Sequence, residues 1–174
     1  MTDKNSSRKL FELDGIQIFD LDRIPDERGF FLEAARKDWS EFFSKDWISQ
    51  ANISCSYPGM IRAWHRHARG QIDYFLVLGG SMKIVAYDGD TNSKSHSKLV
   101  EIVASEQRAQ IVKIPGHYWH GTKTLGEKPS LTLYFVNNLY EYKNPDEERR
   151  PWNDTLIVDS KTGESYDWNM PPHK

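Results

Sequence analysis

Two histidines, His65 and His67, lie two residues apart in the segment Gly59–Gln71 and could carry out proton transfer or bind a metal ion. Imidazole titrates near neutral pH and is among the commonest metal ligands in proteins. The segment has the alternating pattern of a β-strand, in which successive side chains point to opposite faces. His65 and His67 are therefore predicted to share one face. The other face is predicted to hold Arg62, Trp64, Arg66 and Ala68.

A third histidine with the same capacity, His120, follows the turn-forming pair Pro115-Gly116. A turn here, after the alternating run 110–114, would bring His120 back toward the first two histidines if the strands belong to one barrel. A single strand histidine is most often a packing residue, so only the convergence of several imidazoles favours a functional site. The sequence thus predicts a histidine-lined pocket for acid–base chemistry or metal binding.

The composition limits the class of protein. A chain of 174 residues is long enough for one domain with a substantial core but short for two. The net charge of −2 gives no electrostatic reason to expect nucleic-acid or membrane binding. Cys55 is the only cysteine, so no intrachain disulfide can form. Together with a polar N-terminus that lacks the apolar core of a secretion signal, this favours a cytoplasmic protein.

Most of the chain reads as short β-strands, because alternating apolar runs are separated by clusters of Gly, Pro, Asn, Asp and Ser. The predicted strands are 10–13, 16–21, 30–33, 48–56, 61–67, 72–78, 82–87, 99–104, 110–114 and 131–136. One helix is predicted over 37–45, with Asp38 or Ser40 as its N-cap. Such a series of strands is typical of a β-sandwich or a jelly-roll barrel.

Three further segments are predicted to be irregular. Residues 1–9 are expected to be flexible, and residues 144–150 are expected to be a charged connector within a C-terminal tail, 144–174. Residues 88–98 are rich in Asp, Asn and Ser, which favours a flexible loop and makes this segment a candidate to close over a ligand.

The two histidine segments resemble the paired motifs of the cupin barrels. The first motif is matched by Gly59, His65, His67, Gln71 and Gly79, with Gln71 where the family usually has Glu. The second is matched by Pro115 and His120, with His117 where Gly is usual. The resemblance implies one all-β cupin domain over 1–174, a jelly-roll barrel with one or two short helices.

Within the cupins, the chain resembles the dTDP-4-dehydrorhamnose 3,5-epimerase family. Six segments in the family's order carry the resemblance: 26–33, 50–56, 59–65, 114–121, 133–140 and 151–154. The resemblance implies that His65 is the general base that takes a proton next to the C4 ketone of a nucleotide-linked sugar. Tyr134 would return a proton on the opposite face, and His120 would stabilise the enolate. Without the resemblance, Tyr134 would be read as a packing residue of an apolar strand.

The resemblance also implies a binding site for the nucleotide-diphosphate sugar. Arg28 and Arg62 would hold the diphosphate, because a guanidinium pairs well with phosphate oxygens. The remaining predicted substrate contacts are Phe31, Glu33, Gln50, Asn52, His67 and Tyr140. The family pattern further implies a homodimer that works without a cofactor.

Three positions depart from the family pattern. Asp73 stands where the family usually has Lys. A carboxylate ~4 Å from the enolate would repel it by roughly 4 kcal/mol at an effective dielectric of about 20. This repulsion is expected unless Asp73 faces away from the pocket or is protonated. The Asp that orients the base has no clear counterpart, since neither Asp159 nor Asp167 lies in a matching motif. His67 replaces the usual Gln.

These departures leave three alternatives open. His65, His67, Gln71 and His120 could form a metal-dependent cupin site, which would exclude His65 as a free base. The adjacent histidines also resemble those of the sugar 3,4-ketoisomerases. Asp73 and the missing Asp are compatible with a sugar-nucleotide binding protein that has no catalytic activity.

Overall fold

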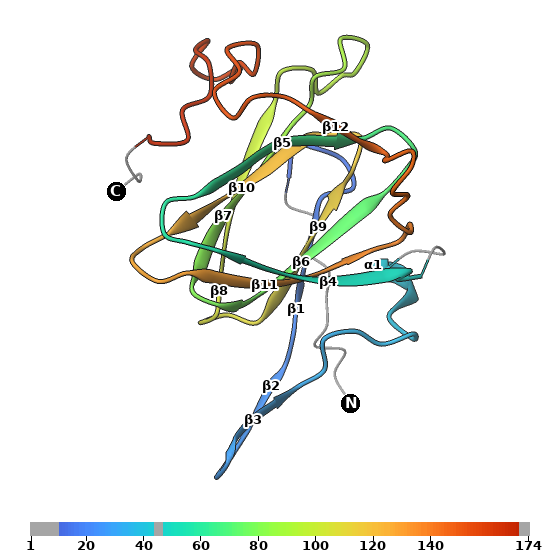
Figure 1. The fold of residues 1–174 in the computed structure, drawn as a ribbon, viewed down its shortest axis with the longest axis vertical. Helices are drawn as coiled ribbons and strands as arrows, with labels where there is room; N and C mark the ends of the chain where they lie inside the picture. The colour runs from blue at the N-terminus through green and yellow to red at the C-terminus, as the bar shows by residue number, and fades with distance from the viewer. Residues whose placement is uncertain (1–10, 44–46, 171–174) are drawn as a thin grey trace.

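Alternating side chains build two five-stranded antiparallel sheets that face one another (Figure 1). The computed structural model describes residues 11–43 and 47–170. The first sheet contains, in spatial order, β1 (Gln17–Asp20), β9 (Gln110–Pro115), β6 (Ile72–Gly79), β11 (Ser130–Val136) and β4 (Gln50–Ser56). The second contains β12 (Glu147–Arg149), β5 (Ile61–His67), β10 (Trp119–Leu125), β7 (Ser81–Tyr87) and β8 (Leu99–Ser105).

The space between the sheets is filled with apolar side chains on one side only. Residues of β7, β8 and β9, among them Ile84, Ile102 and Val112, form a buried cluster there. On the other side, where β4, β5, β11 and β12 lie, polar side chains line a cavity instead. This two-sided arrangement is the cupin jelly-roll barrel that the sequence predicted, and it leaves room for a ligand beside a rigid core.

A register shift on β5 changes which side chains face the interior. His120 of β10 lies opposite His65, but Thr122 lies opposite Arg62, so β5 contains one extra residue between the two pairs. Strict alternation predicted Arg62 on the face of Trp64, and this was wrong: Arg62 lines the interior cavity with His65. Trp64 packs on the outer face, as predicted.

The C-terminal segment is more than a connector and tail. Strand β12 pairs with β5, which places Glu147 opposite His67 and Arg149 opposite His65. Further along the chain, Ile157 is fully buried and Trp168 packs on Trp64, with ring centroids 4.9 Å apart. The segment therefore covers the outer face of the strand that carries both motif histidines.

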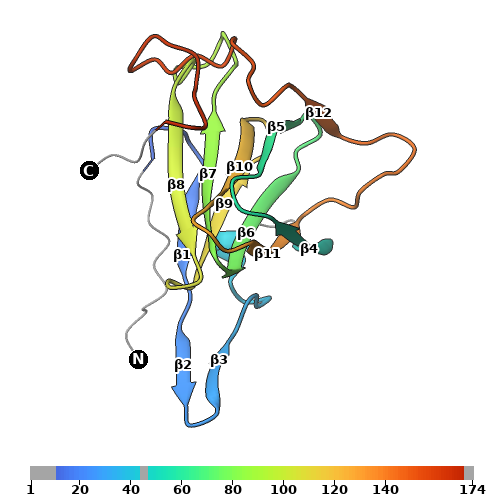
Figure 2. The same cartoon turned by 60° about the vertical axis from the view of Figure 1, so that its left-hand side comes forward.

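A two-stranded hairpin, β2 (Arg23–Asp26) and β3 (Gly29–Leu32), projects away from the barrel (Figure 2). Its apolar side chains are exposed, with Phe30 and Phe31 at 55% and 59%. The predicted turn between residues 25 and 29 is the tip of this hairpin. Since exposed aromatic side chains are costly on an isolated surface, this hairpin is a candidate interaction element.

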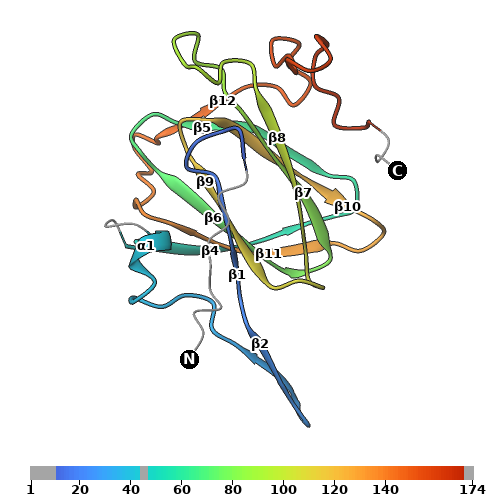
Figure 3. The ribbon, with the colours of Figure 1, turned by 180° about the vertical axis from the view of Figure 1, so that it is seen from behind.

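Several predicted boundaries differ from those observed. Residues 11–13 form no strand although Leu13 is buried. The helix begins at Ser40 rather than at residue 37, and its described part, α1 (Ser40–Phe43), packs against the first sheet (Figure 3). The predicted end of the helix, residues 44 and 45, lies outside the described residues. Asp38 does not cap this turn with its side chain but binds Arg36. Strands β2, β10 and β12 were not predicted. The expected flexibility of residues 1–9 lies outside the described residues. In the described chain, no helix is long and apolar enough to cross a membrane.

The buried side chain of Lys113, on β9, links the first sheet to α1. Its ammonium donates to the carbonyl of Phe42 at 2.9 Å and lies 5.7 Å from the Tyr74 ring centroid. Burial lowers the pKa of Lys113 below its ordinary value. The charged form is therefore less favourable in the folded chain than in the unfolded chain.

We expect the stability difference between the wild-type protein and Lys113→Met to depend on pH. A lysine whose pKa is lowered on folding makes unfolding take up a proton between the folded and unfolded pKa values. As pH rises through that window toward 10.5, the wild type should gain stability relative to the variant. Urea unfolding at several pH values between 7 and 10.5 would measure this. Lys128→Met, which removes a lysine from an exposed bend, is the matched control. If the stability difference between the wild type and Lys113→Met does not change with pH, the assigned effect of burial on Lys113 is wrong.

Candidate active site

A cavity of about 770 Å³ opens between the two sheets. One wall is formed by β4, β6 and β11, which contribute Gln50, Asn52, Asp73 and Tyr134. The opposite wall is formed by β5, β10 and β12, which contribute Arg62, His65, His67, His120 and Glu147. Side chains from both sheets thus meet in a polar pocket large enough for a sugar nucleotide.

The predicted base and acid stand on opposite walls. His65 projects from β5 and Tyr134 from β11, and both are partly buried. Tyr134 is paired across the sheet with Asn52 on one side and Phe75 on the other, which fixes its place on the wall. Two groups that face a ligand from opposite sides can remove and return a proton on different faces of one carbon.

The His65 ring is held neutral. Burial is the largest influence and lowers the pKa of His65 to about 4, while the Glu147 carboxylate partly opposes this and His120 adds to it. A neutral imidazole keeps a lone pair that can accept a proton. At neutral pH, His65 is therefore in the state that a general base requires.

The Tyr134 phenol is held protonated. Burial raises the pKa of Tyr134, and the carboxylates of Asp73 and Glu147 raise it further, although Arg62 opposes them. A protonated phenol can donate only to a strongly basic centre, such as an enolate carbon. The electrostatics of the two walls are thus those of a base facing an acid.

Asp73 points into the pocket, but its charge is balanced. Its Oδ2 lies 3.2 Å from Nε2 of His120 and 3.5 Å from Nε2 of His67, and Gln71 donates to its Oδ1 at 3.0 Å. Burial raises the pKa of Asp73, but His120, His67 and Gln71 outweigh this and lower it. For His120, burial lowers the pKa, but Asp73 outweighs it and the pKa is raised. Asp73 is neither turned away nor protonated, and the opposing charge on His120 reduces the repulsion expected from the sequence.

Most of the predicted site residues meet in this one pocket. The residues brought together are His65, His67, His120, Tyr134, Arg62, Gln50, Asn52, Gln71 and Tyr140. Arg28, Phe31 and Glu33 do not line the pocket of their own chain. Arg28 lies at the hairpin tip, pairs with Asp26 and has an 84% exposed side chain, and Glu33 binds Arg36. A role for these three in binding therefore needs a second copy of the chain.

Sequence reasoning missed the contribution of β12. Glu147 and Arg149 line the pocket, and the carboxylate of Glu147 binds the guanidinium of Arg149. Among the described groups, Glu147 is the carboxylate that raises the pKa of His65, whereas Asp159 and Asp167 accept backbone hydrogen bonds in turns elsewhere. The charged run 146–150 next to the segment 151–154 was the available signal, but it was read as a connector.

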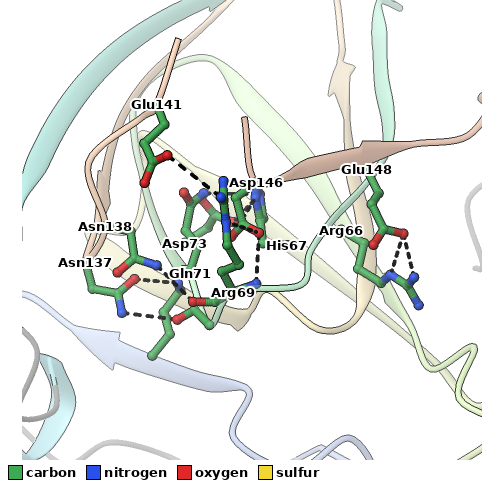
Figure 4. Close-up of polar contacts among 12 residues, drawn as sticks. Arg66, His67, Arg69, Gln71, Asp73, Asn137, Asn138, Glu141, Asp146 and Glu148 are labelled. Atoms are coloured by element: carbon green, nitrogen blue, oxygen red, sulfur yellow. Dashed lines mark hydrogen bonds and ion pairs between the residues drawn. The ribbon is translucent and has the colours of Figure 1, made fainter. Parts of the chain in front are cut away.

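The pocket rim comes from the loop between β11 and β12, which contributes Tyr140 and Asp146 (Figure 2). Arg69 holds this loop. Its guanidinium donates to the carbonyl of Asn144 at 2.5 Å. Its backbone N–H donates to the carboxylate of Asp146 at 2.8 Å (Figure 4). Residues 88–98, the loop predicted to close over a ligand, contribute nothing to the pocket lining.

One group of side chains has the composition of a metal site. His67, Asp73 and His120 are buried, and their ligand atoms lie within 4.8 Å of one another. The set differs from the one predicted from sequence, because Asp73 takes part and His65 does not. His65 therefore stays free of this group.

An antiparallel barrel with a histidine-lined pocket between its sheets defines the cupin class of proteins. Comparison with known sequences gives the family: the sequence profile of dTDP-4-dehydrorhamnose 3,5-epimerase matches residues 11–162. The chain belongs to this family and is an epimerase-like enzyme, as the sequence motifs predicted.

Two curated relatives match nearly their full length. A probable low-salt glycan biosynthesis epimerase, Agl13, from Haloferax volcanii is 39% identical over 158 residues, which cover 91% of this chain and 96% of that protein. The spore coat polysaccharide biosynthesis protein SpsL from Bacillus subtilis is 33% identical over 157 residues, which cover 90% and 97%. Similarity at this coverage extends across the whole barrel.

Solved structures show the same fold. A dTDP-6-deoxy-D-glucose-3,5-epimerase from Legionella pneumophila, in complex with dTDP-4-keto-L-rhamnose, superposes with a TM-score of 0.75 at 25% identity and covers 84% of this chain and 78% of its own. A dTDP sugar isomerase from Desulfovibrio desulfuricans gives a TM-score of 0.75 at 27% identity, with 87% and 94% covered.

We expect Arg69→Ala to weaken nucleotide binding more than it slows the chemical step. The change removes the guanidinium contacts that hold the loop carrying Tyr140, whereas the predicted catalytic side chains, His65 and Tyr134, stand on strands. Exposed ion pairs contribute about 0–1 kcal/mol each, so KM should rise several-fold while kcat stays within about twofold. Arg108→Ala, which removes an ion pair with Asp20 away from the pocket, is the matched control. A fall in kcat as large as the rise in KM would contradict this expectation, because it would show that Arg69 also positions the side chains of the chemical step.

Proposed function

We propose that the protein epimerises a dTDP-4-keto-6-deoxyhexose at C3, C5 or both, by proton transfer next to the C4 ketone. The observation that carries this proposal is the placement of a neutral imidazole, His65, and a protonated phenol, Tyr134, on opposite walls of one pocket. The complex of the Legionella relative with dTDP-4-keto-L-rhamnose supports the choice of substrate.

In the proposed reaction, His65 takes the proton from the carbon next to the ketone, which gives an imidazolium and an enolate. Tyr134 then gives its phenolic proton to the opposite face of the same carbon, and the configuration inverts. Solvent protons restore the phenol while the imidazolium loses its proton, so the enzyme returns to its starting state. Arg62, which reaches the pocket through the register shift on β5, would bind the diphosphate.

The proposed working unit is a homodimer. Arg28, Phe31 and Glu33 can bind substrate only if the projecting hairpin reaches the pocket of a second copy. The exposed aromatic side chains of the hairpin support such an interface. The proposal includes a cytoplasmic location, in line with a single cysteine that forms no intrachain disulfide.

The decisive test is hydrogen exchange in deuterated water. Incubation with a dTDP-4-keto-6-deoxyhexose should introduce deuterium at C3 or C5, and His65→Asn should reduce this by roughly 1000-fold or more because the base is lost. Nucleotide affinity should fall less than about threefold, and His96→Asn, an exposed histidine outside the pocket, should behave as wild type.

Other outcomes would replace the proposal. Migration of the carbonyl from C4 to C3 would indicate a 3,4-ketoisomerase, in which His67 shares the proton transfer. Binding without exchange at either carbon would indicate a sugar-nucleotide binding protein. Equal loss of binding and exchange in His65→Asn would assign His65 a structural role.

Complementation tests the shared site. Arg28→Ala and His65→Asn should each be nearly inactive alone. Mixing them after mild unfolding should restore roughly a quarter of the wild-type rate, because half of the dimers are mixed and each then has one complete site. If Arg28 acted within its own chain, both sites of every mixed dimer would be defective, one lacking Arg28 and the other lacking His65. Mixing would then restore no activity.

A further inference from the structure

The loop between β11 and β12, residues 137–146, is fastened at both ends to the turn that joins β5 to β6. At the start of the loop, the side chain of Asn137 donates to the carbonyl of Gly70 at 3.2 Å. At its end, Oδ1 of Asp146 accepts from the backbone N–H of Arg69 at 2.8 Å (Figure 4). The loop therefore forms the pocket rim with both of its ends held.

The middle of this loop carries apolar side chains that face the pocket but are not covered. Leu139 and Tyr140 line the pocket, yet they are 69% and 43% exposed. Removing apolar surface from water is favourable. A ligand that fills the pocket would therefore draw the loop inward.

Asp146, at the end of the loop, approaches His67 without reaching it. Its Oδ2 lies 4.0 Å from Nδ1 of His67, about 1 Å beyond the length of a hydrogen bond. Both atoms are buried, and neither has a hydrogen-bond partner among the described residues. Buried polar atoms without a partner are unfavourable, so a small inward shift that joins these two atoms would stabilise the closed loop.

The two atoms are a matched donor and acceptor. The ionised carboxylate of Asp73 can only accept, so the amide nitrogen of Gln71 must face its Oδ1, at 3.0 Å. The same nitrogen lies 3.1 Å from Nε2 of His67 and donates to it, which leaves the proton of the neutral ring on Nδ1. The Nδ1–H of His67 therefore faces the carboxylate of Asp146.

The backbone of His67 is fixed, so the loop has to supply the movement. The backbone N–H of His67 donates to the carbonyl of Gly116 at 2.7 Å, and Gly116 donates to the carbonyl of Gln71 at 2.9 Å. A Cβ at position 116 would lie 2.8 Å from Cβ of His67 and 2.4 Å from the carbonyl oxygen of Gln71. The two turns are thus in direct contact, and the gap to His67 can close only from the side of Asp146.

We propose that the 137–146 loop is a latch that closes on a bound nucleotide, and that Asp146 is the positioning residue that fastens it by accepting a hydrogen bond from Nδ1 of His67. The new contact fixes the His67 ring and, through Gln71, the carboxylate of Asp73 on the opposite wall. Closure of the loop and ordering of the polar wall are then one event. This inference rests on the proposed function only in taking a sugar nucleotide as the ligand.

A double-mutant cycle with dTDP as the probe tests the latch. Asp146→Asn keeps one oxygen, which cannot serve Arg69 and His67 together, and should weaken dTDP binding roughly 10-fold. His67→Gln keeps polar atoms near the position of Nε2 and removes the donor at Nδ1, so it should weaken binding by a similar factor. The double variant should bind at most about twofold more weakly than either single variant, because both changes remove the same contact.

The cycle has a matched control and a contrary outcome. Asp159→Asn, which changes a carboxylate in a turn outside the pocket, should bind dTDP as the wild type does. Losses that multiply to about 100-fold in the double variant would show that Asp146 and His67 act independently. That result would overturn the latch.

A measurement on the wild-type protein does not depend on how the variants fold. In protein labelled with ¹⁵N-histidine, the proton on Nδ1 of His67 should move downfield when dTDP binds, as expected for a new hydrogen bond to a carboxylate. The resonance is assigned by its loss in His67→Gln, and Asp146→Asn should abolish the shift. An unchanged resonance, or no binding of dTDP, would overturn the latch.

Deuterium exchange into the sugar separates this inference from the proposed function. If dTDP closes the latch but no deuterium enters C3 or C5 of the sugar, the epimerase function fails and the latch stands. If deuterium enters without the shift and without the coupling, the function stands and the latch fails.

Discussion

The contact between Asp73 and His120 joins the two sheets across the interior of the barrel. Asp73 stands on β6 in one sheet and His120 on β10 in the other, so the contact is possible only when the sheets pack at their observed separation. Two buried polar groups that depend on each other in this way tolerate little movement, since separating them would leave an uncompensated charge. The contact therefore fixes the width of the pocket, and with it the position of His65 relative to Tyr134.

The strands with clear apolar alternation were predictable from sequence, and β5 was predicted with the bounds that the structure has. β10 was missed because several of its buried residues, His120, Thr122 and Thr124, are polar. Thr124 bonds Ser130 at 2.9 Å, and such pairing cannot be predicted from one strand alone. Arg62 was placed on the wrong face because an extra residue in β5 is invisible to an alternation rule. The grouping of His65, His120 and Tyr134 depended on motif resemblance, since spacing alone does not specify how distant strands pair.

Asp73 shows why a substitution is hard to judge one position at a time. Considered alone, a carboxylate at the pocket wall opposes an enolate. In the barrel the neighbours of Asp73 are His67 and His120, which lower the pKa of its carboxyl group and stabilise its negative charge. The electrostatic effect belongs to the group of three side chains, and only the packing of β5, β6 and β10 reveals that group.

The pocket is built from two kinds of chain segment. His65 and Tyr134, the proposed base and acid, stand on paired strands, whereas Tyr140 and Asp146 belong to the long connection between β11 and β12. Insertions and substitutions in a surface connection leave the sheets intact. Changes in this rim can therefore alter which ligands the pocket admits without disturbing the strands that carry His65 and Tyr134.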